Sequence, residues 1–563
     1  LRWAVLLLIC VAAVAEARVL LERGTSLRVP HGFTNLGRAD AKAEMEIMVF
    51  LKQQNMDKLT RELDETSNPK SARYGQHWTI EQVNALTKPS DSTYGEVIQW
   101  LKSSGVQRIE LGANPEILKV RANVQVIEQL LAITVSSFRH TSGHQYMRSL
   151  EHYSVPAHIA AHVSMIGGVN RLPTATAPVP PRPVGSSPTE VTPQTIRKLY
   201  NIPAPTTPAS GVVQAVVSFL GQYWAPSDLA SFQRWAKLMV NPIARLVGFN
   251  DPAPSASGVE ASLDVDYLVG IPEYVPTWVW STNGTIAFGN EPWMVFLDDV
   301  VSELKKNPGK NFPSVFSMSY QDLEFTVSEA YAKSVCSLFQ KITMTGITFV
   351  TGSGDWGVGC NPEQGASCNT FTADFPSSCP YVTSLGGTYV NSQGQEVSVD
   401  FSSGGFSNYF ARPAFQDATI KKYLEVPSVR AISHLFNTSG RAFPDLSTVS
   451  TNFQVFANGQ RIPVAGTSAA TPTFAAMVTM LNDYRVKASM SNMGWINPFL
   501  YQAKAASPRS FTDIVAGDTQ MRGCCGRSFA AIPGYDAVTG LGSPMFDLLK
   551  NLALQPHLLL TEN

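Results

Sequence analysis

The chain has 563 residues; 44% of them are hydrophobic, 15% are charged, and the formal net charge is -1. A chain of this length predicts about two to four domains with large apolar cores. The balanced charge gives no electrostatic reason to expect nucleic acid as a partner, although it does not exclude a local basic patch.

The N-terminal segment has the pattern of a secretory signal peptide. Arg2 precedes an apolar run over residues 4–15, and Ala13, Ala15 and Ala17 supply the small residues of a cleavage site. We therefore expect residues 1–17 to be removed on entry into the secretory pathway. After them, no run is long and apolar enough to span a bilayer.

The secretory route makes disulfides and N-glycosylation available to the chain. Acceptor sequences for N-glycans begin at Asn283 and Asn437. Of the seven cysteines, Cys10 belongs to the signal segment, and the other six permit fifteen pairings. These six are Cys336, Cys360, Cys368, Cys379, Cys524 and Cys525.

Residues 18–172 have the pattern of a compact α/β unit. The expected strands are 44–51, 107–112 and 117–120, and the expected helices are 56–63, 94–103 and 124–131. Residues 173–190 are too rich in proline and small polar residues to pack, and they predict an exposed linker. A folded unit joined by a cleavable linker to a larger unit is the organisation of a zymogen, although an ordinary two-domain protein would look similar.

Residues 191–563 form the larger unit, in which apolar strands alternate with helices. The expected strands are 212–220, 245–249, 315–320, 347–351 and 381–385, and the expected helices are 226–240, 259–269, 293–305 and 328–345. This alternation predicts a three-layer α/β domain with a parallel sheet. Active sites of such domains lie at the carboxyl ends of the strands.

A candidate nucleophile follows in this unit. Gly466, Thr467 and Ser468 precede small residues, Pro472 and an apolar run over 473–481. The pattern places a serine in the first turn of a helix, where backbone N–H groups are unpaired. The alternative is that Thr467 or Ser468 only caps the helix.

The histidines argue against a Ser-His-Asp triad. Seven of the nine lie in the first 162 residues, which leaves His434 and His557 for the unit that carries Ser468. Neither of them has a rigid sequence context, so a carboxylate is the better candidate base. Because an ordinary carboxyl is ionised only above about pH 4, such a base indicates acidic working conditions.

Three motifs supply carboxylates. Glu260 and Asp264 are four residues apart and so share one helix face, where burial would make them share a proton; on a surface they would be solvated charges. Asp355 follows a strand in a Gly-rich turn, for which a turn-forming role is the alternative. Asp513 and Asp536 lie on loops rich in backbone carbonyls, which suit calcium.

Taken together, these motifs resemble the sedolisin family of serine-carboxyl peptidases. Residues 67–71 with Tyr74 and Gly75 are similar to the family's prosegment signature, and residues 191–201 resemble the start of its mature enzyme. The resemblance covers nearly the whole chain. It implies a subtilisin-like catalytic domain, preceded by a ferredoxin-like α/β prodomain that inhibits it.

The resemblance also implies a role for each candidate residue. Ser468 would attack the scissile carbonyl, and Glu260 would accept its proton. Asp264 would hold Glu260 through a shared proton. Asp355 would sit in the oxyanion hole and, to donate a hydrogen bond there, would have to be protonated.

One structural Ca²⁺ is implied by the same resemblance. Its ligands would be the side chains of Asp513 and Asp536 and the carbonyls of Ile514, Ile532 and Gly534. The sequence departs from the family pattern at Ile532, where Gly is usual, and at Trp356, where a small residue is expected and a substrate subsite would be reshaped. The cysteines depart as well, and pairing of Cys360 with Cys524 or Cys525 is our leading hypothesis.

These inferences predict an acid peptidase that releases tripeptides from free N-termini of polypeptides in lysosomes and is made as a self-activating zymogen. We further expect charging of prodomain histidines to loosen the prodomain at acid pH; these are His140, His144, His152, His158 and His162. The alternatives are an acid endopeptidase of the same family and an inactive secreted glycoprotein that acts by binding. Secretion is the alternative to lysosomal delivery.

Overall fold

The computed structural model describes residues 17–22, 29, 32–141, 143, 145–172, 190–282, 292–307, 311–359, 369–521 and 526–560. The expected signal peptide up to residue 16, His144, the linker over 173–189, the acceptor Asn283 and four of the six cysteines after the signal segment lie outside these residues. The predicted pairing of Cys360 with Cys524 or Cys525 therefore also lies outside the described residues. In the part that is described, no helix is long and apolar enough to cross a membrane.

The larger unit, residues 191–563, which we call the peptidase unit after the resemblance, is built on an eight-stranded sheet in the order β11-β12-β10-β13-β15-β17-β18, with β21 also paired to β17. The strand pairs are parallel except for β17 with β18. The strands are β10 (Gln214–Ser218), β11 (Arg245–Gly248), β12 (Thr277–Ser281), β13 (Val315–Met318), β15 (Thr348–Gly352), β17 (Thr383–Val390), β18 (Glu396–Ser398) and β21 (Leu446–Val449).

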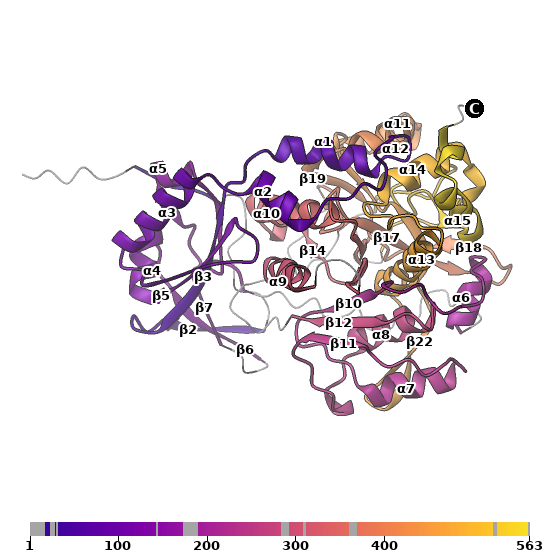
Figure 1. Ribbon diagram of the computed structural model, residues 1–563, viewed down its shortest axis with the longest axis horizontal. Helices are drawn as coiled ribbons and strands as arrows, with labels where there is room; N and C mark the ends of the chain where they lie inside the picture. Colours follow the sequence, from indigo (N-terminus) through magenta and orange to yellow (C-terminus); the bar gives the residue numbers. More distant parts are fainter. Residues whose placement is uncertain are drawn as a thin grey trace, which may run out of the picture.

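Helices cover both faces of this sheet (Figure 1). On one face lie α7 (Pro226–Trp235), α8 (Val259–Gly270) and α13 (Thr467–Lys487); on the other lie α9 (Trp293–Lys306) and α10 (Glu329–Thr343). In β10, Val216 joins the core under α8 and α13, while Ala215 and Val217 join the core under α9 and α10. The alternation follows from the two-residue period of a strand, and it confirms the predicted three-layer α/β architecture.

Elements of this unit differ from the sequence prediction, among them the sheet strands β18 and β21, which were not predicted. The strand β12 was not predicted, although it lies between β10 and β11 in the sheet. The helix predicted over 226–240 ends at Trp235, because Lys237 adopts a left-handed backbone with φ of 54°. A helix cannot continue through that conformation.

The prodomain contains a four-stranded antiparallel sheet in the order β4-β5-β3-β9. Its strands are β3 (Glu44–Leu51), β4 (Arg108–Leu111), β5 (Ile117–Asn123) and β9 (Val163–Gly167). The helix α3 (Asp91–Ser103) lies between β3 and β4 in the chain, and α4 (Val124–Leu131) follows β5. This chain order and strand order are those of a ferredoxin-like fold, as the sequence resemblance implied.

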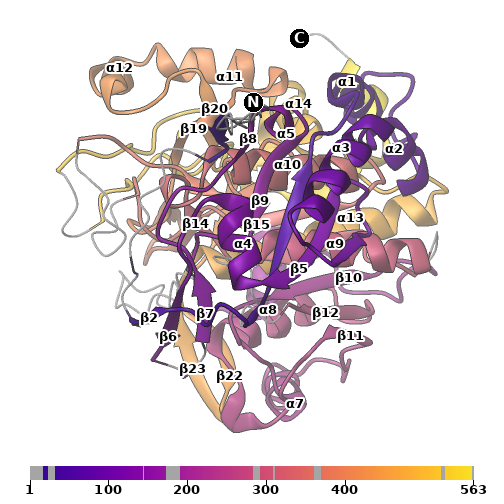
Figure 2. The ribbon, with the colours of Figure 1, turned by 90° about the vertical axis from the view of Figure 1, so that its left-hand side faces the viewer.

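The prodomain sheet is packed between its own helices and the peptidase unit. In β3, Val49 belongs to the core shared with α3 and α4, whereas Met48 and Phe50 join the core that contains Phe339 of α10. Two further helices, α1 (Met56–Ser67) and α2 (Ile80–Thr87), extend from the prodomain over the peptidase unit (Figure 1). Figure 2 shows the prodomain from the side that faces away from that unit.

The remaining elements are small sheets and short helices around these two units. They are β1 (Arg18–Leu20), β2 (Phe33–Arg38), β6 (Ser136–His140), β7 (Gln145–Arg148), β8 (Ser154–Pro156), β14 (Asp322–Leu323), β16 (Asp374–Phe375), β19 (Gly405–Ala411), β20 (Gly440–Phe443), β22 (Phe453–Ala457), β23 (Gln460–Val464), β24 (Phe511–Thr512), β25 (Ser543–Pro544), α5 (Ala157–Ala160), α6 (Pro193–Leu199), α11 (Ala414–Leu424), α12 (Pro427–Ala431), α14 (Asn497–Ala506) and α15 (Phe546–Leu554).

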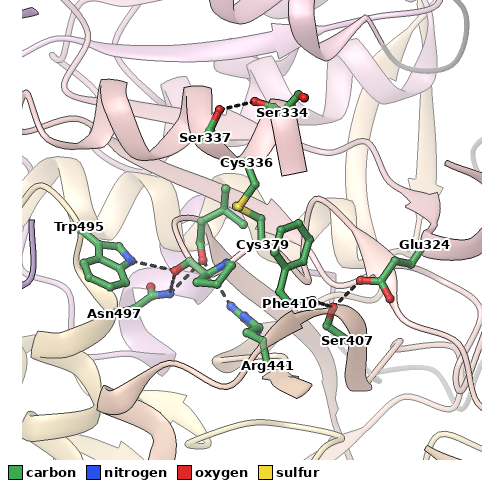
Figure 3. Close-up of a disulfide and its surroundings, with 12 residues drawn as sticks. Glu324, Ser334, Cys336, Ser337, Cys379, Ser407, Phe410, Arg441, Trp495 and Asn497 are labelled. Atoms are coloured by element: carbon green, nitrogen blue, oxygen red, sulfur yellow. Dashed lines mark hydrogen bonds between the residues drawn. A yellow bond between two sulfur atoms is a disulfide. The ribbon is translucent and has the colours of Figure 1, made fainter. Parts of the chain in front are cut away.

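A disulfide joins Cys336 of α10 to Cys379, which precedes β17, with the two Cα atoms 5.7 Å apart (Figure 3). Both cysteines are buried in the core beneath α9 and α10. The bond ties a covering helix to the sheet. It is one of the fifteen pairings that the sequence left open.

Candidate active site

Ser468 lies in the first turn of α13, at the carboxyl ends of the central strands, and the residue is 7% exposed. Gly466 precedes the helix as its N-cap, and a Cβ there would come within 3.1 Å of an oxygen of Asp355. Four residues after Ser468 comes Pro472, which has no N–H to donate to the Ser468 carbonyl. The serine is therefore held in the first turn while its own carbonyl lacks the usual helical partner.

Glu260 occupies the first turn of α8, which packs against α13. Its carboxyl group accepts a hydrogen bond from the Ser468 hydroxyl. Burial raises the pKa of Glu260 to about 8; the Ser468 hydrogen bond opposes the rise, and the nearby charge of Asp355 adds to it. The hydroxyl group predicted to be the nucleophile thus contacts the carboxylate predicted to be its base.

Asp264 lies one turn further along α8 and is completely buried. Burial, then the charge of Glu260, raises the pKa of Asp264 well above its usual range, and a hydrogen bond from Ser319 opposes this. The Ser319 hydroxyl oxygen is 2.7 Å from Oδ1 of Asp264. Glu260 and Asp264 are therefore both buried, which is the arrangement in which the sequence predicted a shared proton.

Asp355 lies just after β15, in the turn that the sequence predicted. Its Oδ1 accepts hydrogen bonds from the backbone N–H of Thr467 at 2.7 Å and from the Thr467 hydroxyl at 3.0 Å. The same hydroxyl accepts from the N–H of Gly354 at 3.2 Å. The turn after β15 and the start of α13 are thus locked together, with Asp355 beside the N-terminus of the helix that carries Ser468.

Further buried carboxyls surround Asp355, and sequence reasoning missed them. The carboxyl of Asp374 hydrogen-bonds Ser403, and burial raises its pKa well above the usual range, with further increases from Asp355, Glu324 and Asp322. Glu324 accepts from the Ser407 hydroxyl and from the Asn408 N–H, and burial raises its pKa to about 7. One signal for them was in the sequence, because Asp322 and Glu324 lie within four residues of the end of the strand predicted over 315–320.

The two histidines considered as alternative bases lie elsewhere. His434 is in a surface turn, where its Nε2 is 3.2 Å from a guanidinium nitrogen of Arg527. His557 is exposed in the C-terminal turn. Glu260, and neither histidine, is close enough to Ser468 for the serine to lower its pKa by hydrogen bonding.

The loops predicted to bind calcium also come together. Asp513 Oδ2 accepts from the N–H of Gly534 at 2.9 Å, and Asp536 Oδ2 accepts from the N–H of Ile532 at 2.9 Å. Gly534 has a φ of 93°, which favours glycine at this turn. The described residues contain no group of three or more His, Cys, Asp or Glu suited to a metal. Backbone carbonyls would therefore have to complete any cation site here.

Comparisons with known proteins agree with this geometry. Residues 31–172 match the family described as Pro-kumamolisin, activation domain. The structure of Pseudomonas sedolisin, a serine-carboxyl proteinase, superposes with a TM-score of 0.51 at 19% identity, over 64% of this chain and 97% of that one. The peptidase unit therefore has a subtilisin-like fold, and the activation domain before it gives the chain the organisation of a zymogen.

Full-length relatives identify the branch. A tripeptidyl-peptidase 1 from Bos taurus is 35% identical over 558 residues, which cover 94% of this chain and 95% of the relative. The Dictyostelium discoideum protein of that name is 31% identical over 556 residues, with 91% and 90% covered. The chain belongs to the tripeptidyl-peptidase 1 family of sedolisins.

Proposed function

We propose that the protein is an acid exopeptidase that releases tripeptides from the free N-termini of polypeptides. Ser468 attacks the scissile carbonyl, Glu260 takes the serine proton, and Asp264 holds Glu260. Asp355 donates a hydrogen bond to the oxyanion. The observation that carries this proposal is that the helix with the buried Glu260–Asp264 pair packs against the helix with Ser468, and that the Ser319 hydroxyl lies 2.7 Å from Asp264 and 3.4 Å from the Ser468 carbonyl oxygen.

The protonation states of the site residues explain why the proposed enzyme works at acid pH. Glu260 and Asp264 share one proton, so that Glu260 carries the charge that accepts the Ser468 proton while Asp264 stays neutral. Their raised pKa values keep that one proton on the pair up to neutral pH, so the requirement for acid falls on Asp355. Oδ1 of Asp355 already accepts two hydrogen bonds from Thr467, so a catalytic proton resides on Oδ2, beside Gly466. An ionised Asp355 would instead repel the oxyanion.

Release of tripeptides is supported by similarity to tripeptidyl-peptidases 1 along nearly the whole chain. The prodomain acts as an inhibitor until acid pH permits cleavage in the linker, and the lysosome supplies the acid. The expected signal peptide and glycosylation acceptors fit delivery through the secretory pathway.

We also propose one structural Ca²⁺ held by Asp513, Asp536 and the carbonyls of Ile514, Ile532 and Gly534. The residues fit a hard cation: the Asp536 carboxyl is fully buried, Asp513 approaches the same turn, and burial of Asp536 raises its pKa to about 7. A calcium ion would supply the positive charge that a buried carboxylate needs. Its role would be to hold the two loops together.

The test is a cleavage assay of the acid-activated protein between pH 3 and 7 with a free-amine tripeptide reporter, its N-blocked copy and the Ser468→Ala variant. We expect acid cleavage of the free-amine reporter alone, abolished in the variant. Comparable cleavage of the blocked copy would replace the exopeptidase by an endopeptidase. Absence of any Ser468-dependent cleavage would leave a binding glycoprotein.

A further inference from the structure

Ser319 contacts both the proposed acid pair and the segment that carries the proposed nucleophile. It directly follows β13, the residue is 6% exposed, and its hydroxyl lies 2.7 Å from Asp264 Oδ1. The same oxygen is 3.4 Å from the carbonyl oxygen of Ser468, which Pro472 leaves without its usual helical donor. A serine hydroxyl has one proton, so the shorter contact, to Asp264, is the principal one.

This contact determines which oxygen of Asp264 is available for the shared proton. Because Oδ1 accepts from Ser319, the proton of a neutral Asp264 belongs on Oδ2. Among the described residues, Asp264 Oδ2 and Glu260 Oε1 are buried oxygens without a hydrogen-bond partner. One proton between them satisfies both, and it leaves the second Glu260 oxygen for the Ser468 hydroxyl.

We propose that Ser319 is a positioning residue for the reaction: it directs the shared proton to Asp264 Oδ2 and stabilises the singly charged form of the Glu260–Asp264 pair. This inference rests on the proposed function, since it assumes that Glu260 is the base. Nothing in the chemistry requires Ser319 to contact substrate. Its effect passes through Asp264.

Several groups around the Glu260–Asp264 pair affect the pKa at which the pair becomes charged. On α8, Asp264 faces Glu260; from the segment after β13 it faces Ser319 and the Tyr320 phenol, whose pKa burial and then Glu260 raise well above its usual range. Glu260 also faces Ser468 of α13 and Asp355. With Ser319 removed, the anion loses a donor, so the pKa for its formation rises.

The test compares Ser319→Ala with Ser317→Ala in the full-length, acid-activated protein. Ser317 is a matched control, because it lies in β13 two residues before Ser319, so that both point to the same side, it is fully buried, and its hydroxyl has no partner among the described residues. We expect Ser319→Ala to move the acidic limb of kcat/KM upward by about one pH unit, with about tenfold lower kcat below that limb and KM little changed. Ser317→Ala should keep the parental profile.

Ser319→Thr restores the hydroxyl and should return the limb toward its parental position, which a purely structural role of Ser319 does not predict. An unchanged pH profile in Ser319→Ala, or the same shift in Ser317→Ala, would overturn the proposal. If the parent itself shows no cleavage that depends on Ser468, the proposed function fails and the inference fails with it. Parental activity with an unshifted Ser319→Ala variant refutes the inference alone.

Discussion

A buried ion pair links the prodomain to the peptidase unit and can be tested by removing either partner. Lys341 of α10 lies with its Nζ 2.7 Å from both carboxyl oxygens of Glu116, which lies between β4 and β5. Both side chains are 0% exposed, and Gln53 also donates to Glu116. Burial lowers the pKa of Lys341, and the Glu116 charge opposes that shift.

Removing one partner leaves the other charge buried and unpaired, which typically costs roughly 3–5 kcal/mol. We therefore expect Lys341→Met or Glu116→Gln to destabilise the proform by that amount, or roughly 10²- to 10⁴-fold in the equilibrium constant for its unfolding. The double substitution should cost far less than the sum of the two single ones, since no charge is then left buried.

The assay is guanidinium unfolding at pH 7 in the Ser468→Ala background, which cannot process its own linker. Glu110→Gln is the control, because its pair with Arg108 is exposed and should contribute about 0–1 kcal/mol. Lys341→Met should leave the mature enzyme unaffected, because the lysine reaches water once the prodomain has left. Single variants as stable as the parent, or strictly additive losses in the double variant, would refute this reasoning.

Three further predictions follow from the structure. His77 is buried in the prodomain interface, with Nε2 2.9 Å from the Asn492 carbonyl oxygen, and burial lowers its pKa; its contribution to docking is therefore present above about pH 6.5 and lost as the pH falls. His77→Gln should slow acid activation without weakening the proform at pH 7.5. Equal activation rates of the variant and the parent from pH 4 to 7 would contradict this role of His77. Gly354→Ala should abolish activity, because the added Cβ would lie 2.6 Å from an Asp374 oxygen at a φ of 113°; an active, stable variant would contradict that geometry. Chelation with EDTA should lower the melting temperature of the parent but not of Asp536→Asn, as differential scanning calorimetry would show, and equal responses would remove the calcium proposal.

Much of the fold could be predicted from the sequence, because buried strands carry continuous apolar runs. The strand over 44–51 and the helix over 124–131 were predicted with their observed bounds. The strand β12 was missed although Trp278, Val279 and Trp280 form an aromatic and β-branched run, a usual strand signal. The early end of α7 was not readable, since nothing in the residue type predicts a left-handed lysine at position 237.

The site was predicted from chemistry carried by single residues, and the missing parts depend on tertiary contacts. Sequence motifs and residue spacing were enough to predict Ser468, Glu260 and Asp355 as site residues. Ser319 is an ordinary serine at a strand end until the fold brings it to Asp264. The prodomain histidines proposed to sense acid remain untested, and the structure adds His77, which lies against the peptidase unit.

The central claim is that a glutamate, and no histidine, activates the serine. The most direct test is the pH dependence of kcat/KM for free-amine tripeptide release by the acid-activated parent and by Glu260→Gln. The account predicts an acid optimum for the parent and a loss of at least about 10³-fold in the variant at every pH, because the amide cannot accept the Ser468 proton. Retained activity in Glu260→Gln would contradict the account and assign the proton to another base.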